Sequence, residues 1–204
     1  MAVTEAPAPT PALPPAPGPT TLPEPTGMAP FGMAVFVAAD AAVLGGLLAA
    51  LFALRAQSFV WPPPEGARLG AYLPTMITIT VLLSAVSVQW AVWSIRRNDQ
   101  RNCLFALGLT AFFGLAALNG EWYQLAHLNF AISRHPFDTF VYVLVGFHMA
   151  HALAGVVLLV SMLARTTTGE FSADEHGSLT AAAIFWQFAN LAWVAAYAFL
   201  WVKP

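Results

Sequence analysis

Five long apolar runs follow one another along the chain and dominate its pattern of hydrophobic and polar positions. They cover residues 30–54, 72–95, 103–125, 138–164 and 179–202. About 20 residues of helix are enough to span the roughly 30 Å hydrocarbon core of a bilayer. The runs lack the strict alternation of apolar and polar positions that a membrane strand requires. Because a spanning segment must satisfy its backbone hydrogen bonds internally, the runs predict an all-α integral membrane bundle of five transmembrane helices.

The N-terminal segment has a different pattern. Residues 1–27 hold nine of the sixteen prolines, mixed with alanine and threonine. Proline lacks an amide donor and disfavours helix in the residue before it. The sequence therefore predicts a disordered Pro/Ala-rich tail, followed by one transmembrane domain over residues 28–204.

Composition agrees with a membrane environment. Charged residues make up 9% of the chain and hydrophobic residues 58%, whereas a soluble domain carries roughly 25% charged residues. The net charge of -2 gives no basis for a nucleic-acid partner. The single cysteine, Cys103, excludes an internal disulfide and a multi-cysteine metal site.

Basic residues give the expected orientation. Arg96, Arg97 and Arg101 cluster between the second and third runs, next to two helix ends where basic residues have most weight. Counted over all eight basic residues, the two sides are equal, with four residues on each. The cluster predicts a cytoplasmic N-terminus and an outside C-terminus.

Two carboxylates lie inside the runs, away from their first residues. An ionised group in hydrocarbon costs about 2.5–3.5 kcal/mol on insertion scales, so each needs a reason. Asp40, near the middle of the first run, has two readings: a hydrogen bond or ion pair with a buried partner, or a lipid-linked or proton-linked role. Glu121, toward the end of the third run beside Trp122 and Tyr123, is expected to reach the interface and anchor its helix.

Two pairs of polar residues repeat a three-residue spacing. His148 and His151 share one face of the fourth run, a spacing that also suits a metal or haem pair. No other run contains a histidine, so interhelical hydrogen bonds are expected and a metal site is not. Gln187 and Asn190 have the same spacing on the fifth run, where side-chain amides usually join helices.

Together, these residues resemble a known family. The segment Gly146-Phe-His-Met-Ala-His-Ala-Leu-Ala-Gly155 is similar to the G-F-H-x-x-H-x-x-x-G of subunit III of the haem–copper respiratory oxidases, in its shorter five-helix bacterial form. Phe185-Trp-Gln-Phe-Ala-Asn-Leu-Ala-Trp193 is similar to the family's Y-W-H-F-V-D-x-x-W. Phe36-Val-Ala-Ala-Asp40 follows F-L-x-S-E, Leu73-Pro74 opens the second run as in the family, and Glu121 falls at the Glu of Q-x-x-E-Y. The likeness covers residues 30–204.

The chain departs from the family pattern at positions that matter for chemistry. Asp40 replaces a glutamate, which shortens the side chain by one methylene. Gln187 and Asn190 replace His and Asp, which removes titratable groups but keeps hydrogen-bonding capacity. The proton-linked roles of the family's His and Asp therefore do not carry over to Gln187 and Asn190.

The resemblance implies a non-catalytic subunit of an aa3-type cytochrome c oxidase in a bacterial plasma membrane. Such a chain holds no cofactor, packs beside subunits I and II, which carry the haem and copper, and binds phospholipid in a cleft between helices. It supports proton uptake and stability during turnover, and a supercomplex with a cytochrome bc complex is a further expectation. By the resemblance, Asp40 lies beside the lipid cleft, and five residues make interhelical polar contacts: Glu121, His148, His151, Gln187 and Asn190.

Three alternatives stay open from the sequence. The chain could belong to a quinol oxidase or a nitric oxide reductase, because the electron donor is not encoded here. A small transporter would require paired broken helices or a polar stripe along a pore. A membrane haem protein ligated by His148 and His151 would require a second chain, since two residues of one helix turn cannot occupy both axial positions.

Overall fold

The computed structural model describes residues 27–62, 69–132 and 134–202, and in these ranges the regular structure is entirely helical. The helices are α1 (Met28–Gln57), α2 (Tyr72–Ile95), α3 (Gln100–Ala126), α4 (Pro136–Thr167) and α5 (Gly177–Tyr197), and a π-helical segment, η1 (Ala198–Val202), continues α5. All five are long and apolar enough to cross a membrane. The predicted five-helix membrane fold is confirmed, whereas the predicted tail, apart from Gly27, lies outside the described residues.

Among the helices that begin earlier than the apolar pattern predicts, α3 and α4 are capped by polar side chains. Asp99 precedes α3, and its carboxylate accepts a hydrogen bond from the backbone amide of Asn102 at 3.0 Å. This bond and a second one from the Asn102 side chain hold the pKa of Asp99 below its usual value. At the start of α4, His135 accepts from the amide of Phe137 at 3.1 Å, and Pro136 occupies the first position, where no amide donor is needed.

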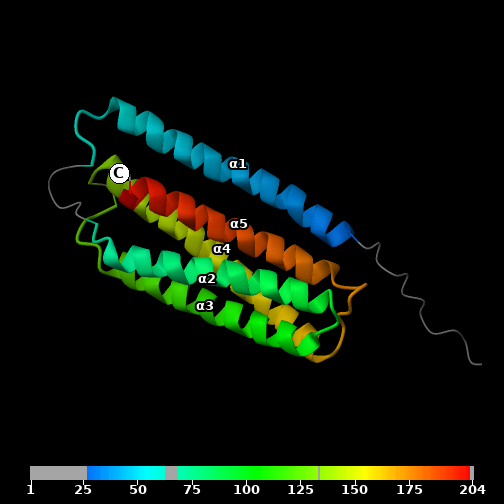
Figure 1. Ribbon diagram of the computed structural model, residues 1–204. Coiled ribbons are helices and arrows are strands. Elements are labelled where there is room, and N and C mark those ends of the chain that lie inside the picture. The colour runs from blue at the N-terminus through cyan, green and yellow to red at the C-terminus, as the bar shows by residue number, and fades with distance from the viewer. Residues whose placement is uncertain (1–26, 63–68, 133, 203–204) are drawn as a thin grey trace, which may run out of the picture.

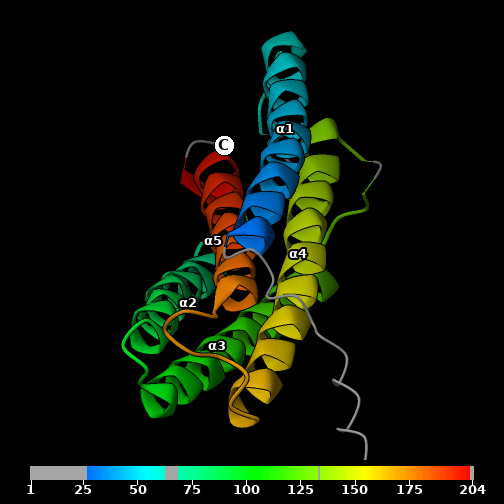
Figure 2. The same ribbon diagram turned by 90° about the vertical axis from the view of Figure 1, so that its right-hand side faces the viewer.

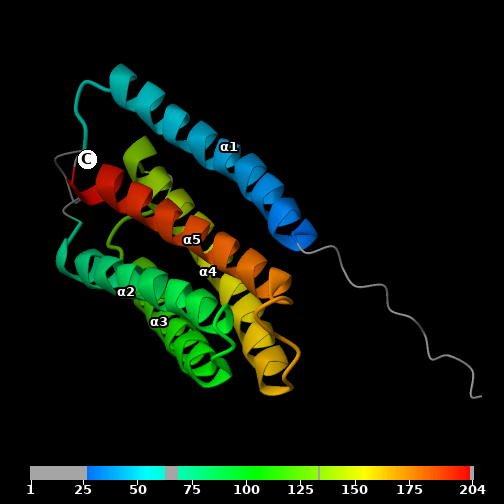
Figure 3. The same cartoon turned by 45° about the vertical axis from the view of Figure 1, so that its right-hand side comes forward.

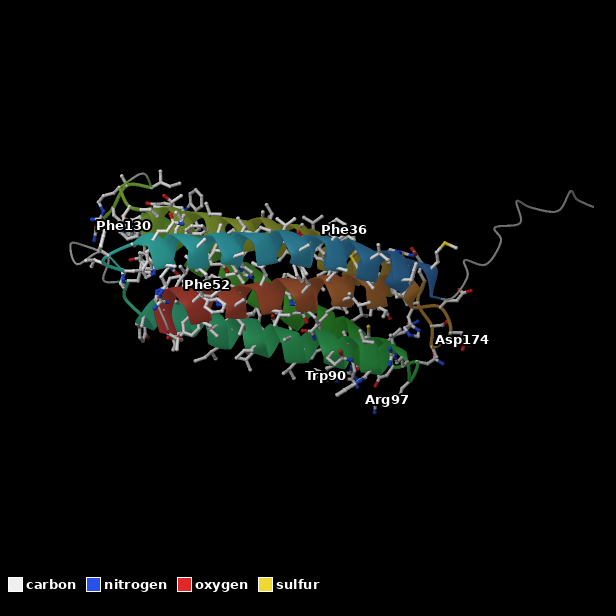
Figure 4. All side chains as sticks on the ribbon, turned by 90° about the horizontal axis from the view of Figure 1, so that it is seen from above. Phe36, Phe52, Trp90, Arg97, Phe130 and Asp174 are labelled. Atoms are coloured by element: carbon white, nitrogen blue, oxygen red, sulfur yellow. The ribbon has the colours of Figure 1, made fainter. Side chains whose placement is uncertain are left out.

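The helices form three layers (Figure 1). α4 and α5 occupy the middle, α1 lies on one side of them, and α2 and α3 lie on the other. The contacts agree: α1 packs on α5 and α4, while α2 and α3 pack on each other and on the middle pair. The views in Figures 2 and 3 show α1 standing apart from α2 and α3. Arg97 and Asp174 lie at one end of the bundle and Phe130 at the other (Figure 4).

Burial is uneven among the layers. One core cluster fills the space between α2, α3, α4 and α5 around Leu107, Leu159 and Trp186. By contrast, α1 buries only Leu44 and Leu51, both in a second cluster near the other end of the bundle. Most of the apolar surface of α1 therefore faces outward.

Two glycines admit the largest side chain of the first cluster. A Cβ added at Gly114 of α3 would lie 2.6 Å from the Trp186 ring, and one added at Gly155 of α4 would lie 2.5 Å from it. The indole Nε1 of Trp186 donates to Ser84 Oγ of α2 at 3.1 Å. Trp186 of α5 thus contacts α2, α3 and α4, and it does so only because both glycines lack a side chain.

We expect Gly155→Ala to destabilise the bundle, because the added methyl overlaps a buried ring that has no free space to enter. Overpacking of this kind typically costs about 1–3 kcal/mol. Gly146→Ala is the matched control on the same helix, since a Cβ there meets no heavy atom within 4 Å. Unfolding of the two purified variants by denaturant in detergent measures the difference, and equal stability of both would contradict the packing role of Gly155.

Candidate functional site

The two histidines of α4 each contact a carboxylate from a different helix. His148 Nδ1 lies 2.9 Å from Glu121 Oε2 of α3, and His151 Nε2 lies 2.6 Å from Asp40 Oδ2 of α1. The sequence placed both histidines on one face of the helix. The structure uses that face to hold α4 between α3 and α1 through two carboxylate–histidine pairs.

The Asp40–His151 pair holds one shared proton. His151 Nδ1 lies 2.7 Å from the carbonyl oxygen of Phe147. A carbonyl oxygen only accepts hydrogen bonds, so Nδ1 carries a hydrogen. The contact of 2.6 Å between Nε2 and Oδ2 then requires one proton between them. Whether that proton resides on nitrogen or on oxygen, the pair as a whole has no net charge, which makes it tolerable in hydrocarbon.

The Glu121–His148 pair is more deeply buried. Glu121 is 0% exposed and His148 is 2% exposed. The expectation that Glu121 anchors its helix at the interface is therefore wrong. Helical geometry turns Trp122 and Tyr123 outward, with exposed fractions of 67% and 56%, while it turns Glu121 toward α4.

The amides of α5 contact α2. Gln187 Nε2 donates to the carbonyl oxygen of Ala85 at 3.0 Å. Asn190 Oδ1 lies 3.3 Å from Ser84 Oγ, the hydroxyl that also accepts from Trp186. The structure thus places all six singled-out residues in contacts between helices, in two pairs with α4 and in two contacts of α5 with α2.

One buried carboxylate was missed by reasoning from the sequence. Asp138, in the first turn of α4, is 0% exposed and lies 2.8 Å from Arg134 Nε. An arginine four residues before an aspartate at a helix start was a usable signal, because acidic residues are favourable there and the spacing permits an ion pair.

A wide apolar cavity borders the Asp40–His151 pair. Its volume is about 650 Å³, and it lies between α1, α4 and α5. His151 forms part of its wall. The remaining lining residues are Gly32, Met33, Phe36, Ala150, Ala154, Val157, Leu158 and Phe185.

Among the described residues, no three His, Cys, Asp or Glu side chains lie close enough together to hold a metal ion. The histidines contact carboxylates in separate pairs instead. The expectation that this chain holds no metal or haem stays a prediction.

We expect His148→Leu to destabilise the bundle by about 3–5 kcal/mol, because it leaves the buried Glu121 carboxylate without its partner. Adding Glu121→Leu should recover much of that loss, since removing both members of a buried polar pair costs less than removing one. Met149→Leu is the control on the same helix. Denaturant unfolding of the single and double variants measures these values, and a double variant less stable than His148→Leu would contradict the pairing.

The chain also matches known proteins. Residues 18–203 match the family described as cytochrome c oxidase subunit III. The chain is 28% identical over 173 residues to a cytochrome c oxidase subunit 3 of Thermostichus vulcanus, which covers 84% of this chain and 86% of the relative. It is 31% identical over 165 residues to a cytochrome c oxidase subunit 3 of Synechocystis, with coverage of 80% and 71%.

A more distant relative has the same description. A probable cytochrome c oxidase subunit 3 of Nocardia farcinica is 26% identical over 174 residues, with coverage of 84% of this chain and 86% of the relative. The match over most of the chain confirms the resemblance seen in its motifs. The protein is a multi-pass membrane protein that belongs to the cytochrome c oxidase subunit III family.

Proposed function

We propose that this chain is the non-catalytic subunit III of an aa3-type cytochrome c oxidase, in which it packs on subunit I and holds phospholipid between α1, α4 and α5. The observation that carries the proposal is the apolar cavity of about 650 Å³ with the Asp40–His151 pair at its wall. Family membership supports association with other oxidase subunits. Haem and copper then belong to subunits I and II.

The chemistry of the cavity favours an acyl chain. Met33, Phe36 and Phe185 line it from both sides, and its one ionisable wall residue, among the described residues, is His151. That histidine already bonds Phe147 and Asp40 through its two nitrogens. A space with so few free polar partners holds water poorly, whereas hydrocarbon fits it.

The Asp40–His151 pair supports this cavity mechanically. α1 buries little of its surface, and the pair joins it to α4 beside the cavity. By fixing the distance between two walls, the pair keeps the lipid in place. Retained lipid in turn supports proton uptake by subunit I and protects the complex during turnover.

The arrangement of basic residues supports a cytoplasmic N-terminus. The α2–α3 turn with Arg96, Arg97 and Arg101 lies at the same end of the bundle as the start of α1. Basic residues next to helix ends favour the cytoplasmic side, so we place the protein in a bacterial plasma membrane with its C-terminus outside. Association with a cytochrome bc complex stays a prediction, and the proline-rich tail, apart from Gly27, lies outside the described residues.

A quinol oxidase is the second candidate, together with a nitric oxide reductase. The relatives described as cytochrome c oxidase subunit 3 favour the first candidate over both. We expect purification through a tag on this chain to bring down a haem- and copper-containing complex that oxidises reduced cytochrome c. Oxidation of quinol alone, or reduction of nitric oxide, would favour the second candidate, and a chain that purifies without redox subunits would overturn the proposal.

We expect Asp40→Asn to leave assembly intact and to lower lipid retention or durability during turnover. Asparagine removes the shared proton, while its amide still reaches His151 Nε2. Asp40→Leu removes the contact altogether and should lose more lipid than Asp40→Asn. Val43→Leu, on the exposed surface of α1, is the control.

The measurements are bound phospholipid per purified complex and activity over prolonged turnover. If both Asp40 variants match the control in both measurements, Asp40 has no role in lipid retention.

A further inference from the structure

A second cavity lies toward the other end of the bundle from the first, where α3 ends and η1 follows α5. Its volume is about 240 Å³, and its walls come from the start of α2, the end of α3 and η1. Unlike the apolar cavity, it carries several hydrogen-bonding side chains: Tyr123, Gln124, His127, Asn129 and Trp201.

Two of these side chains have buried polar atoms without a hydrogen-bond partner in the described part of the protein. Gln124 is 8% exposed, and within the described ranges neither its amide nitrogen nor its amide oxygen has a hydrogen-bond partner. The same holds for the indole Nε1 of Trp201. A buried amide without hydrogen bonds costs roughly 2–7 kcal/mol. A ligand that both donates and accepts hydrogen bonds would remove this cost.

The pocket leads toward the Glu121–His148 pair along two walls. On α3, Glu121 lies one turn before Gln124 on the same face, and its Oε1 also has no partner in the described part of the chain. On the α5 side, the Trp201 ring lies 6.2 Å from the Trp193 ring, which lies 5.0 Å from the His148 ring. Two residues of the pocket wall are therefore connected to the buried carboxylate–histidine pair, Gln124 along α3 and Trp201 through the ring of Trp193.

We propose that this pocket binds ordered water and hydrates the Glu121–His148 pair from its end of the bundle. Water donates and accepts, so it can bond both atoms of the Gln124 amide, accept from Trp201 Nε1 and donate to Glu121 Oε1. The volume suffices for several molecules at roughly 30 Å³ each. An acyl chain would leave all four atoms unpaired.

The two carboxylate–histidine pairs then differ in their surroundings. Glu121–His148 exchanges hydrogens with the aqueous phase through the pocket, while Asp40–His151 borders hydrocarbon. This hydration depends on the geometry around the start of α2, the end of α3 and η1, and it stands whether or not lipid occupies the other cavity.

Radiolytic labelling of the purified oxidase complex tests the proposal. A short X-ray pulse converts water into hydroxyl radicals, which oxidise the side chains beside it. Trp201 should be oxidised several times faster than Trp186, which is 3% exposed and already bonded through Nε1 to Ser84. Equal rates for these two tryptophans would overturn the proposal.

A variant that fills the pocket shows whether Trp201 is oxidised by water in the pocket or only through its exposed ring surface. Gly70 lines the pocket, and a Cβ there meets no heavy atom within 4 Å, so Gly70→Phe can fill the space without a backbone clash. It should lower Trp201 oxidation, whereas Gly108→Phe, at an equally open glycine of α3 outside the pocket, should not. Unchanged Trp201 oxidation in Gly70→Phe would contradict a hydrated pocket.

A density map of the wild-type complex decides the matter without any variant. Solvent peaks within hydrogen-bond distance of the Gln124 amide and Trp201 Nε1 are the expected result. Acyl-chain density, or a side chain of another subunit filling the pocket, would overturn the proposal.

Discussion

The structure depends on one constraint: a polar side chain inside a bilayer needs a partner from another helix. The constraint is strongest at α4, whose two histidines meet carboxylates of α1 and α3. An isolated ionised group in hydrocarbon costs about 2.5–3.5 kcal/mol on insertion scales, so an unpaired arrangement is disfavoured at both places. The three layers follow, because the middle layer must offer polar groups in both directions.

The same helices separate two environments. On one side of α4, the Asp40–His151 pair borders an apolar cavity whose wall histidine has both nitrogens engaged. On the other side, Glu121 and Gln124 retain buried atoms without protein partners beside a pocket with several polar side chains. The two carboxylate–histidine pairs are thus suited to different surroundings: Asp40–His151 to hydrocarbon and Glu121–His148 to water.

Much of the fold could be predicted from the sequence, because the five apolar runs are long and uninterrupted. The helix ends were less predictable, since caps such as Asp99 and His135 lie outside the apolar pattern. The choice of residues for the candidate site also came from the sequence, through their polarity within apolar runs and through the family motifs.

The pairing of those residues could not be predicted in the same way. A three-residue spacing shows that His148 and His151 share a face, but it does not show which neighbouring helix each one meets. Glu121 was assigned to the interface because two aromatic residues follow it, and only the rotation of α3 against α4 shows that it points inward. Partner identity depends on helix packing, which a single sequence does not reveal.

The position of α1 has a consequence for biosynthesis. Among the five described helices, α1 leaves the ribosome before the others, yet it packs on α4 and α5, which are made after α2 and α3. Until α4 enters the membrane, Asp40 cannot contact His151 and stays without this partner in the bilayer or at its surface. α1 therefore completes its docking only after α4 and α5 have been made, so a chain truncated before α4 is left with an undocked helix that quality-control proteases can recognise.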